Sequence, residues 1–102
     1  MDEKGFQIYL NTCNLTSRVI GDYISRSKRV EKHEGNLDLY FKTDGGASLI
    51  RKLTYSKEDE KSCRAPLHSI KFTGTKGYKT IYDGTASLKN AIEAYFEFKR
   101  NQ

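Results

Sequence analysis

Residues 16–35, TSRVIGDYISRSKRVEKHEG, are the stretch that decides the fold. Apolar residues recur there at the three- and four-residue spacing of an amphipathic helix. They are Val19, Ile20, Tyr23, Ile24 and Val30. Thr16 or Asn14 can cap the start of such a helix, and Gly35 can end it because glycine readily adopts the left-handed conformation. The pattern predicts a helix from Thr16 to Glu34.

Helical spacing continues on both sides of this stretch. Phe6, Tyr9, Leu10 and Cys13 share one face of a predicted short helix, where Cys13 is expected to be buried. Residues 37–41 and 47–53 predict two further short helices, separated by a break at 44–46. Residues 55–64 are highly charged and predict a solvated loop or a frayed helix end. The last predicted helix runs from about Thr85 to Lys99.

Residues 65–84 differ in character from the rest of the chain. They hold the only proline, and two runs of alternating β-forming residues, 70–73 and 78–82, flank the sequence Gly-Thr-Lys-Gly. This arrangement predicts a β-hairpin near residues 69–82, with a long ordered loop as the alternative. The expected fold is therefore mainly α, a small bundle of four to five helices with that hairpin inserted, in a single domain spanning residues 1–102.

Composition and charge narrow the classes of partner. Seven Tyr and five Phe argue against a disordered chain, and a net charge of +5 suits a nucleic acid, an acidic protein or an anionic surface. Two cysteines are too few for a disulfide scaffold. Without a signal peptide or a long apolar run, we expect a cytoplasmic protein with no membrane partner.

The predicted helix at 16–34 separates its charges from its apolar residues. At about 100° per residue, one side collects the basic residues Arg18, Arg26, Arg29, Lys32 and His33, with Lys28 at its edge. Asp22 interrupts this side. The pattern indicates either a phosphate-binding surface or an ordinary solvated helix face. Ser17, Ser25 and Ser27 could add hydroxyl contacts to phosphates.

The predicted hairpin adds a second basic region. Aromatic and basic residues interleave from Phe72 to Tyr82, and Lys76 and Lys79 are possible nucleic-acid contacts there. Phe72 and Ile81 are instead expected to pack on the helices.

Motifs for chemistry are absent. Cys13, His33, Cys63 and His68 could be combined as metal ligands, but they lack the close pairing of a zinc finger. Cys63 and His68 lie five residues apart without a third group to orient them. Residues 74–77 lack the spacing of a P-loop. We therefore expect no catalytic residue, no metal and no cofactor, and hence no enzyme.

Two segments resemble a known family. Residues 6–10 with 14–24, and residues 87–98, resemble the two ends of the SAM-like N-terminal core-binding domain of tyrosine recombinases and phage integrases. The resemblance covers about half of the chain; residues 51–84 have no counterpart, and the recombinase catalytic domain is missing. It implies a helical, DNA-gripping module of a mobile element, with contacts from the basic second helix and no chemistry of its own.

Two functions follow as expectations. The first is a DNA-binding module without catalytic activity that grips duplex phosphates with the basic helix face. The alternative is a small protein-binding regulator or inhibitor, of phage or mobile-element type, acting on a nucleic-acid-processing protein. Exposed tyrosines would anchor that partner, since tyrosine is enriched in binding hot spots; the residues considered are Tyr40, Tyr55 and Tyr78.

Overall fold

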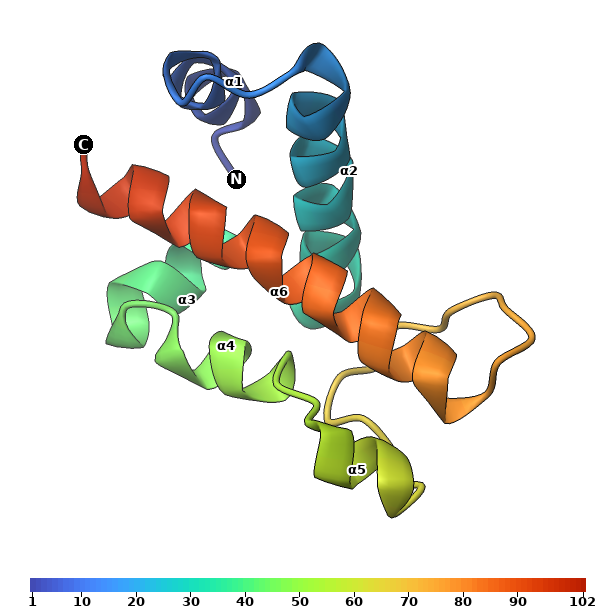
Figure 1. The fold of residues 1–102 in the computed structure, drawn as a ribbon. Coiled ribbons are helices and arrows are strands. Elements are labelled where there is room, and N and C mark those ends of the chain that lie inside the picture. The colour runs from blue at the N-terminus through green and yellow to red at the C-terminus, as the bar shows by residue number, and fades with distance from the viewer.

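The computed structural model describes residues 1–102 and contains six helices and no strand. The helices are α1 (Glu3–Thr12), α2 (Ser17–Glu34), α3 (Leu37–Asp44), α4 (Ala47–Lys52), α5 (Lys57–Lys61) and α6 (Tyr78–Arg100). In Figure 1, α6 runs diagonally in front of α2. Helix α1 lies near the C-terminal half of α6, and α3, α4 and α5 lie on the opposite side of α6. The predicted small helical bundle is confirmed, with α5 as one helix more than expected and without the predicted hairpin.

The long helix α6 organises the core. It contacts α1, α2, α4 and α5, and its most extensive packing is against α2. The buried apolar residues form one continuous cluster. They are Phe6, Leu10, Ile20, Val30, Leu37, Leu49, Leu53, Ile70, Leu88, Ile92, Tyr95, Phe96 and Phe98. The core is therefore completed only by α6, the last helix of the chain.

The ends of α2 match the sequence prediction. The Thr16 side chain accepts a hydrogen bond from the backbone N–H of Val19 at 3.3 Å, and Gly35 follows the last turn at φ 107°. Asn36 then caps α3. The break after α3 has a packing reason as well: Gly46 has φ 88°, and a Cβ there would lie 2.2 Å from the Phe96 ring. The prediction for Cys13 was wrong, because it follows α1 and is exposed.

The predicted hairpin at 69–82 does not form. Its second half, residues 78–82, is the first part of α6, which starts seven residues earlier than predicted. Its first half lies in an irregular segment with alternating burial, in which His68 and Ile70 are buried and Phe72 is half-buried. We call residues 66–73 the docked segment, because its inward side chains contact helices rather than a second strand.

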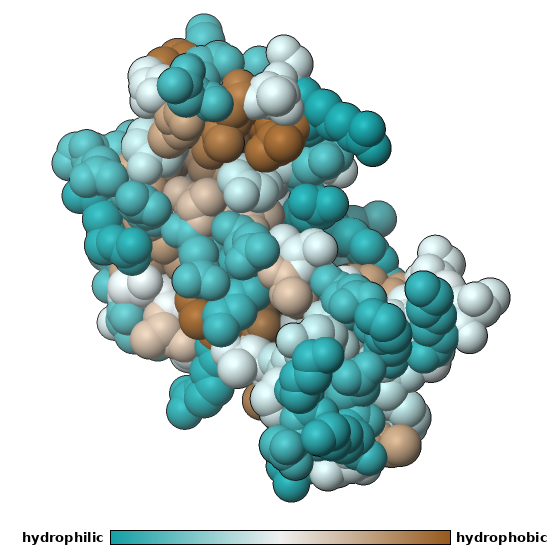
Figure 2. Space-filling view, in the orientation of Figure 1, coloured by the Kyte–Doolittle hydropathy of each residue, from teal (hydrophilic) through white to brown (hydrophobic).

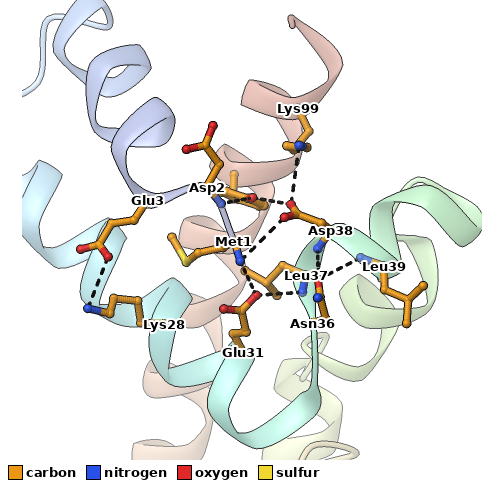
Figure 3. Close-up of polar contacts among 11 residues, drawn as sticks. Met1, Asp2, Glu3, Lys28, Glu31, Asn36, Leu37, Asp38, Leu39 and Lys99 are labelled. Carbon is orange, nitrogen blue, oxygen red and sulfur yellow. Dashed lines mark hydrogen bonds and ion pairs between the residues drawn. The ribbon is translucent and has the colours of Figure 1, made fainter.

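An ion-pair network fixes the N-terminus against α2 and α3 (Figure 3). The Met1 side chain is 3% exposed, and the Met1 ammonium lies 2.9 Å from the Glu31 carboxylate and 3.7 Å from that of Asp38. Glu31 also accepts the backbone N–H of Leu37 at 3.1 Å. Burial alone would lower the pKa of the Met1 ammonium, but the two carboxylates raise it on balance. The network bonds the Glu31 carboxylate within the protein.

No helix is both long enough and apolar enough to cross a membrane. Figure 2 shows a mostly hydrophilic surface on the side of α6, with hydrophobic residues gathered near the end where α1 and α2 join.

Candidate nucleic-acid interface

The solvent-facing side of α2 carries no acidic residue. We call its exposed residues the outer face of α2. They are Ser17, Arg18, Gly21, Ser25, Lys28, Arg29, Lys32 and His33. The three acids of α2, Asp22, Glu31 and Glu34, are all half-buried. Asp22, which spacing places among the basic residues, is thus less exposed than its basic neighbours Arg18 and Arg29.

The docked segment bonds Glu34, the last residue of α2. Its carboxylate accepts hydrogen bonds from the Ser69 hydroxyl at 2.6 Å and the Ser69 backbone N–H at 3.0 Å, and it lies 3.6 Å from the Lys52 ammonium. Burial raises the pKa of Glu34, but the Ser69 hydrogen bonds and Lys52 outweigh burial and lower it. Glu34 is therefore a charged, internally bonded group rather than a surface carboxylate.

Arg29 is also held by the docked segment, which the sequence did not predict. Its guanidinium donates a hydrogen bond to the Lys71 carbonyl and lies 5.3 Å from the centre of the Phe72 ring. A cation over an aromatic face is attracted by the negative charge of the ring. Arg29, expected to contact phosphate, therefore has a structural partner of its own.

The other predicted contacts on α2 divide by their partners. Arg18 and Lys32 are exposed and form no ion pair within the protein, while Arg26 is half-buried. Lys28 lies 3.5 Å from the Glu3 carboxylate of α1, as Figure 3 shows. The His33 side chain is exposed, and its backbone carbonyl accepts a hydrogen bond from Ser69 at 3.4 Å. Arg18 and Lys32 are the two cations best placed for an external anion.

The second basic region lies in the loop before α6 and in the first turn of that helix. Lys76 is exposed in the loop before α6, and its backbone N–H donates to the Thr80 hydroxyl at 3.3 Å. Lys79 pairs with Asp83 one turn later at 3.1 Å, and this hydrogen bond raises the pKa of Lys79. A polar cavity of about 460 Å³ lies between this loop and α6.

Two serines of α2 have different surroundings. Ser25 is exposed on the outer face. Ser27 is fully buried on the side of Ile20 and Val30, and its hydroxyl has no hydrogen-bond partner. The expectation that Ser27 adds a phosphate contact was therefore wrong.

His68 has a structural environment. Its Nδ1 accepts the backbone N–H of Ile70 at 3.1 Å, so in the neutral ring Nε2 carries the proton and donates to the Thr85 hydroxyl at 2.8 Å. Desolvation lowers the pKa of His68, against a smaller opposing effect of Glu34. The ring bonds to Thr85 and Ile70 rather than to Cys63, which is exposed. No three His, Cys, Asp or Glu side chains come together as metal ligands.

The tyrosines considered as anchors for a protein partner are mostly used internally. The Tyr40 hydroxyl donates to the Glu34 carbonyl at 2.9 Å, and the Tyr55 hydroxyl donates to the Arg64 carbonyl at 2.7 Å. Only Tyr78 is an exposed residue, at 40%.

Comparison with known proteins gave no match to this chain among protein-family models, curated protein sequences or solved structures.

Proposed function

We propose that this protein is a duplex-DNA-binding module without catalytic activity, and that the outer face of α2 contacts the phosphates. The observation that carries the proposal is the absence of any acidic residue among the exposed positions of an 18-residue helix. Glu31 and Glu34 are bonded within the protein and Asp22 is half-buried, so the charged residues of α2 that are fully exposed are all basic. Arginine and lysine on a helix are common phosphate contacts.

Three side chains are free enough to make those contacts. Arg18 and Lys32 have no internal partner, and Lys28 shares only an exposed ion pair with Glu3. Exposed pairs of this kind contribute little stability, so Lys28 can exchange Glu3 for a phosphate. Arg29 is excluded from the count because it bonds to the docked segment.

A salt series on a short duplex tests the proposal. For about three neutralised phosphates, log K should fall with log[salt] at a slope of about −2.7. The affinity should thus drop about 40-fold between 50 and 200 mM salt. An absence of binding at 50 mM salt contradicts the proposed function, and a stable complex with an acidic protein instead supports the alternative of a protein-binding regulator.

Matched charge variants separate the outer face of α2 from net charge. The double variant Arg18→Gln/Lys32→Gln should lower the slope by about 1.8 and weaken binding about 60-fold at 0.1 M salt. The control is Lys42→Gln/Arg51→Gln, which removes two exposed charges from α3 and α4. Equal losses in the two double variants indicate an effect of net charge alone and contradict the assignment to α2.

A further inference from the structure

A polar groove lies between α1 and α2. It encloses about 450 Å³, and of its nine lining residues only Ile20 and Ile24 are apolar. Small-molecule sites are predominantly apolar and cover most of the ligand. The lining of this groove suits a hydrated, polar ligand better, and its α2 wall is continuous with the outer face of α2.

Neutral hydrogen-bonding groups line both walls. Gln7 and Asn11 project from α1, and Ser17 and Ser25 from α2. All four are exposed, and none of their side chains forms a hydrogen bond within the protein. Amide and hydroxyl side chains are among the common partners of phosphate and sugar oxygens.

Gly21 makes the groove deeper. It lies one turn from Ser17 and one turn from Ser25, and a Cβ at this position would have no atom within 4 Å. Glycine in a helix interior is less favourable than alanine. Neither packing nor backbone conformation requires glycine at this position, and the missing side chain leaves room in the groove for a ligand.

We propose that this groove seats one sugar–phosphate strand of the duplex; the inference rests on the proposed function and extends it from α2 to α1. Gln7, Asn11, Ser17 and Ser25 donate hydrogen bonds to phosphate and sugar oxygens. Lys28 supplies the cation on the groove wall, and Ile24 contacts the deoxyribose. These neutral contacts add affinity without adding to the salt dependence.

Glu3 lies in the same groove and opposes a phosphate there. Its carboxylate is 3.5 Å from the Lys28 ammonium, so a bound strand must displace it from that pair. Replacing Glu3 with glutamine keeps the shape and removes the negative charge. Glu3→Gln should therefore bind duplex DNA several-fold more tightly than the wild type.

The decisive experiment fills the groove at Gly21 and measures binding of a 20-base-pair duplex together with thermal unfolding. Gly21→Ala should raise the melting temperature by about 4–8 °C and change the affinity little. Gly21→Leu should keep a melting temperature at or above that of the wild type and bind at least about tenfold more weakly. A misfolded variant would lose both stability and affinity. Weaker binding by a protein that is at least as stable as the wild type therefore reports the filled groove.

A second variant decides the matter if Gly21→Leu is unstable. Gln7→Ala/Asn11→Ala alters only exposed side chains and should weaken binding with an unchanged salt slope, unlike Arg18→Gln/Lys32→Gln. Wild-type affinity in this double variant, or in a folded Gly21→Leu protein, contradicts binding of a strand in the groove and leaves the proposed function intact. No binding by the wild type overturns both, and tighter binding of single-stranded RNA than of the duplex overturns the seat for duplex DNA.

Discussion

Replacing Arg29 with alanine is the sharpest test of the division between structural and DNA-binding cations. The Arg29 side chain joins α2 to the docked segment through the Lys71 carbonyl and the Phe72 ring. Arg18, eleven residues earlier on the same outer face, touches neither. The two arginines look equivalent in the sequence, yet they should respond to mutation in opposite ways.

The expected loss of stability can be built from the two contacts. A cation over an exposed aromatic ring contributes about 0.5–1 kcal/mol. A hydrogen bond contributes about 0.5–1.5 kcal/mol net, and the exposure of Arg29 favours the lower half of that range. Arg29→Ala should therefore lower the free energy of unfolding by about 1–2 kcal/mol, and the melting temperature by roughly 4–12 °C for a chain of this size.

Urea denaturation and thermal unfolding followed by circular dichroism measure this change. The matched control, Arg18→Ala, should stay within about 0.5 kcal/mol of the wild type because it alters a surface residue without a partner. A double-mutant cycle with Phe72→Leu should return a coupling of about 0.5–1 kcal/mol for the ring contact.

DNA binding supplies the refuting observation. In a salt series at a temperature where the protein is folded, Arg29→Ala should keep the slope of the wild type, while Arg18→Ala should lower it by about 0.9. An Arg29→Ala protein of unchanged stability whose slope falls by that amount refutes the assignment of Arg29 to the docked segment.

Three further predictions concern stability. Ser27→Ala removes a buried hydroxyl without a hydrogen bond, so it should leave the free energy of unfolding unchanged or raise it by up to about 1 kcal/mol in urea titrations, with normal DNA binding; a clear loss contradicts this. The raised pKa of the Met1 ammonium means that its contribution is complete below pH 8.0 and is lost as the pH rises through the folded value, so unfolding between pH 7 and 9 should show a decline that Glu31→Gln flattens. The lowered pKa of His68 has the opposite sign: its unfolded form binds more protons, so stability should fall as the pH drops below 6.5, and His68→Gln should flatten this fall while lowering stability at pH 7.5.

The helices that the sequence predicted well are those with a clear period and clear ends. In α2, a capping threonine, an apolar stripe and a terminal glycine all indicate the same boundaries. The start of α6 was missed because residues 78–82 alternate like a strand over a short span. Ile81, Thr85 and Leu88 also follow helical spacing, and this longer pattern extends into the core of α6.

The alternation in the docked segment was real, but its cause was misassigned. His68 and Ile70 point inward while Ser69 and Lys71 point outward, as in a strand with one buried side. The inward groups are satisfied by Thr85 of α6 and by the apolar cluster rather than by a neighbouring strand. Periodicity reports which side chains are buried, whereas the identity of the partner depends on contacts far apart in the chain.

The basic side of α2 was also predictable, because the spacing of residues fixes the side of a helix on which each of them lies. Which of its charges are free was not predictable. Arg29 is taken up by a segment more than forty residues away, Glu31 by the N-terminus and Glu34 by Ser69. Likewise, the groove residues Gln7 and Asn11 carry no signal in the sequence, since only the packing of α1 beside α2 places them near the basic side.

The hold of Ser69 on Glu34 makes the electrostatic potential outside α2 a property of the protein's conformation. If the docked segment opens locally, the Glu34 carboxylate loses both Ser69 hydrogen bonds and can turn toward solvent, and Arg29 is released at the same time. The freed Glu34 carboxylate repels a nearby anion, whereas the freed Arg29 guanidinium attracts it. An anion bound beside Glu34 therefore favours the closed segment, whereas one bound beside Arg29 favours the open segment. By thermodynamic reciprocity, amide hydrogen exchange in residues 66–73 would slow in the first case and quicken in the second, reporting from a distance where on α2 the anion lies.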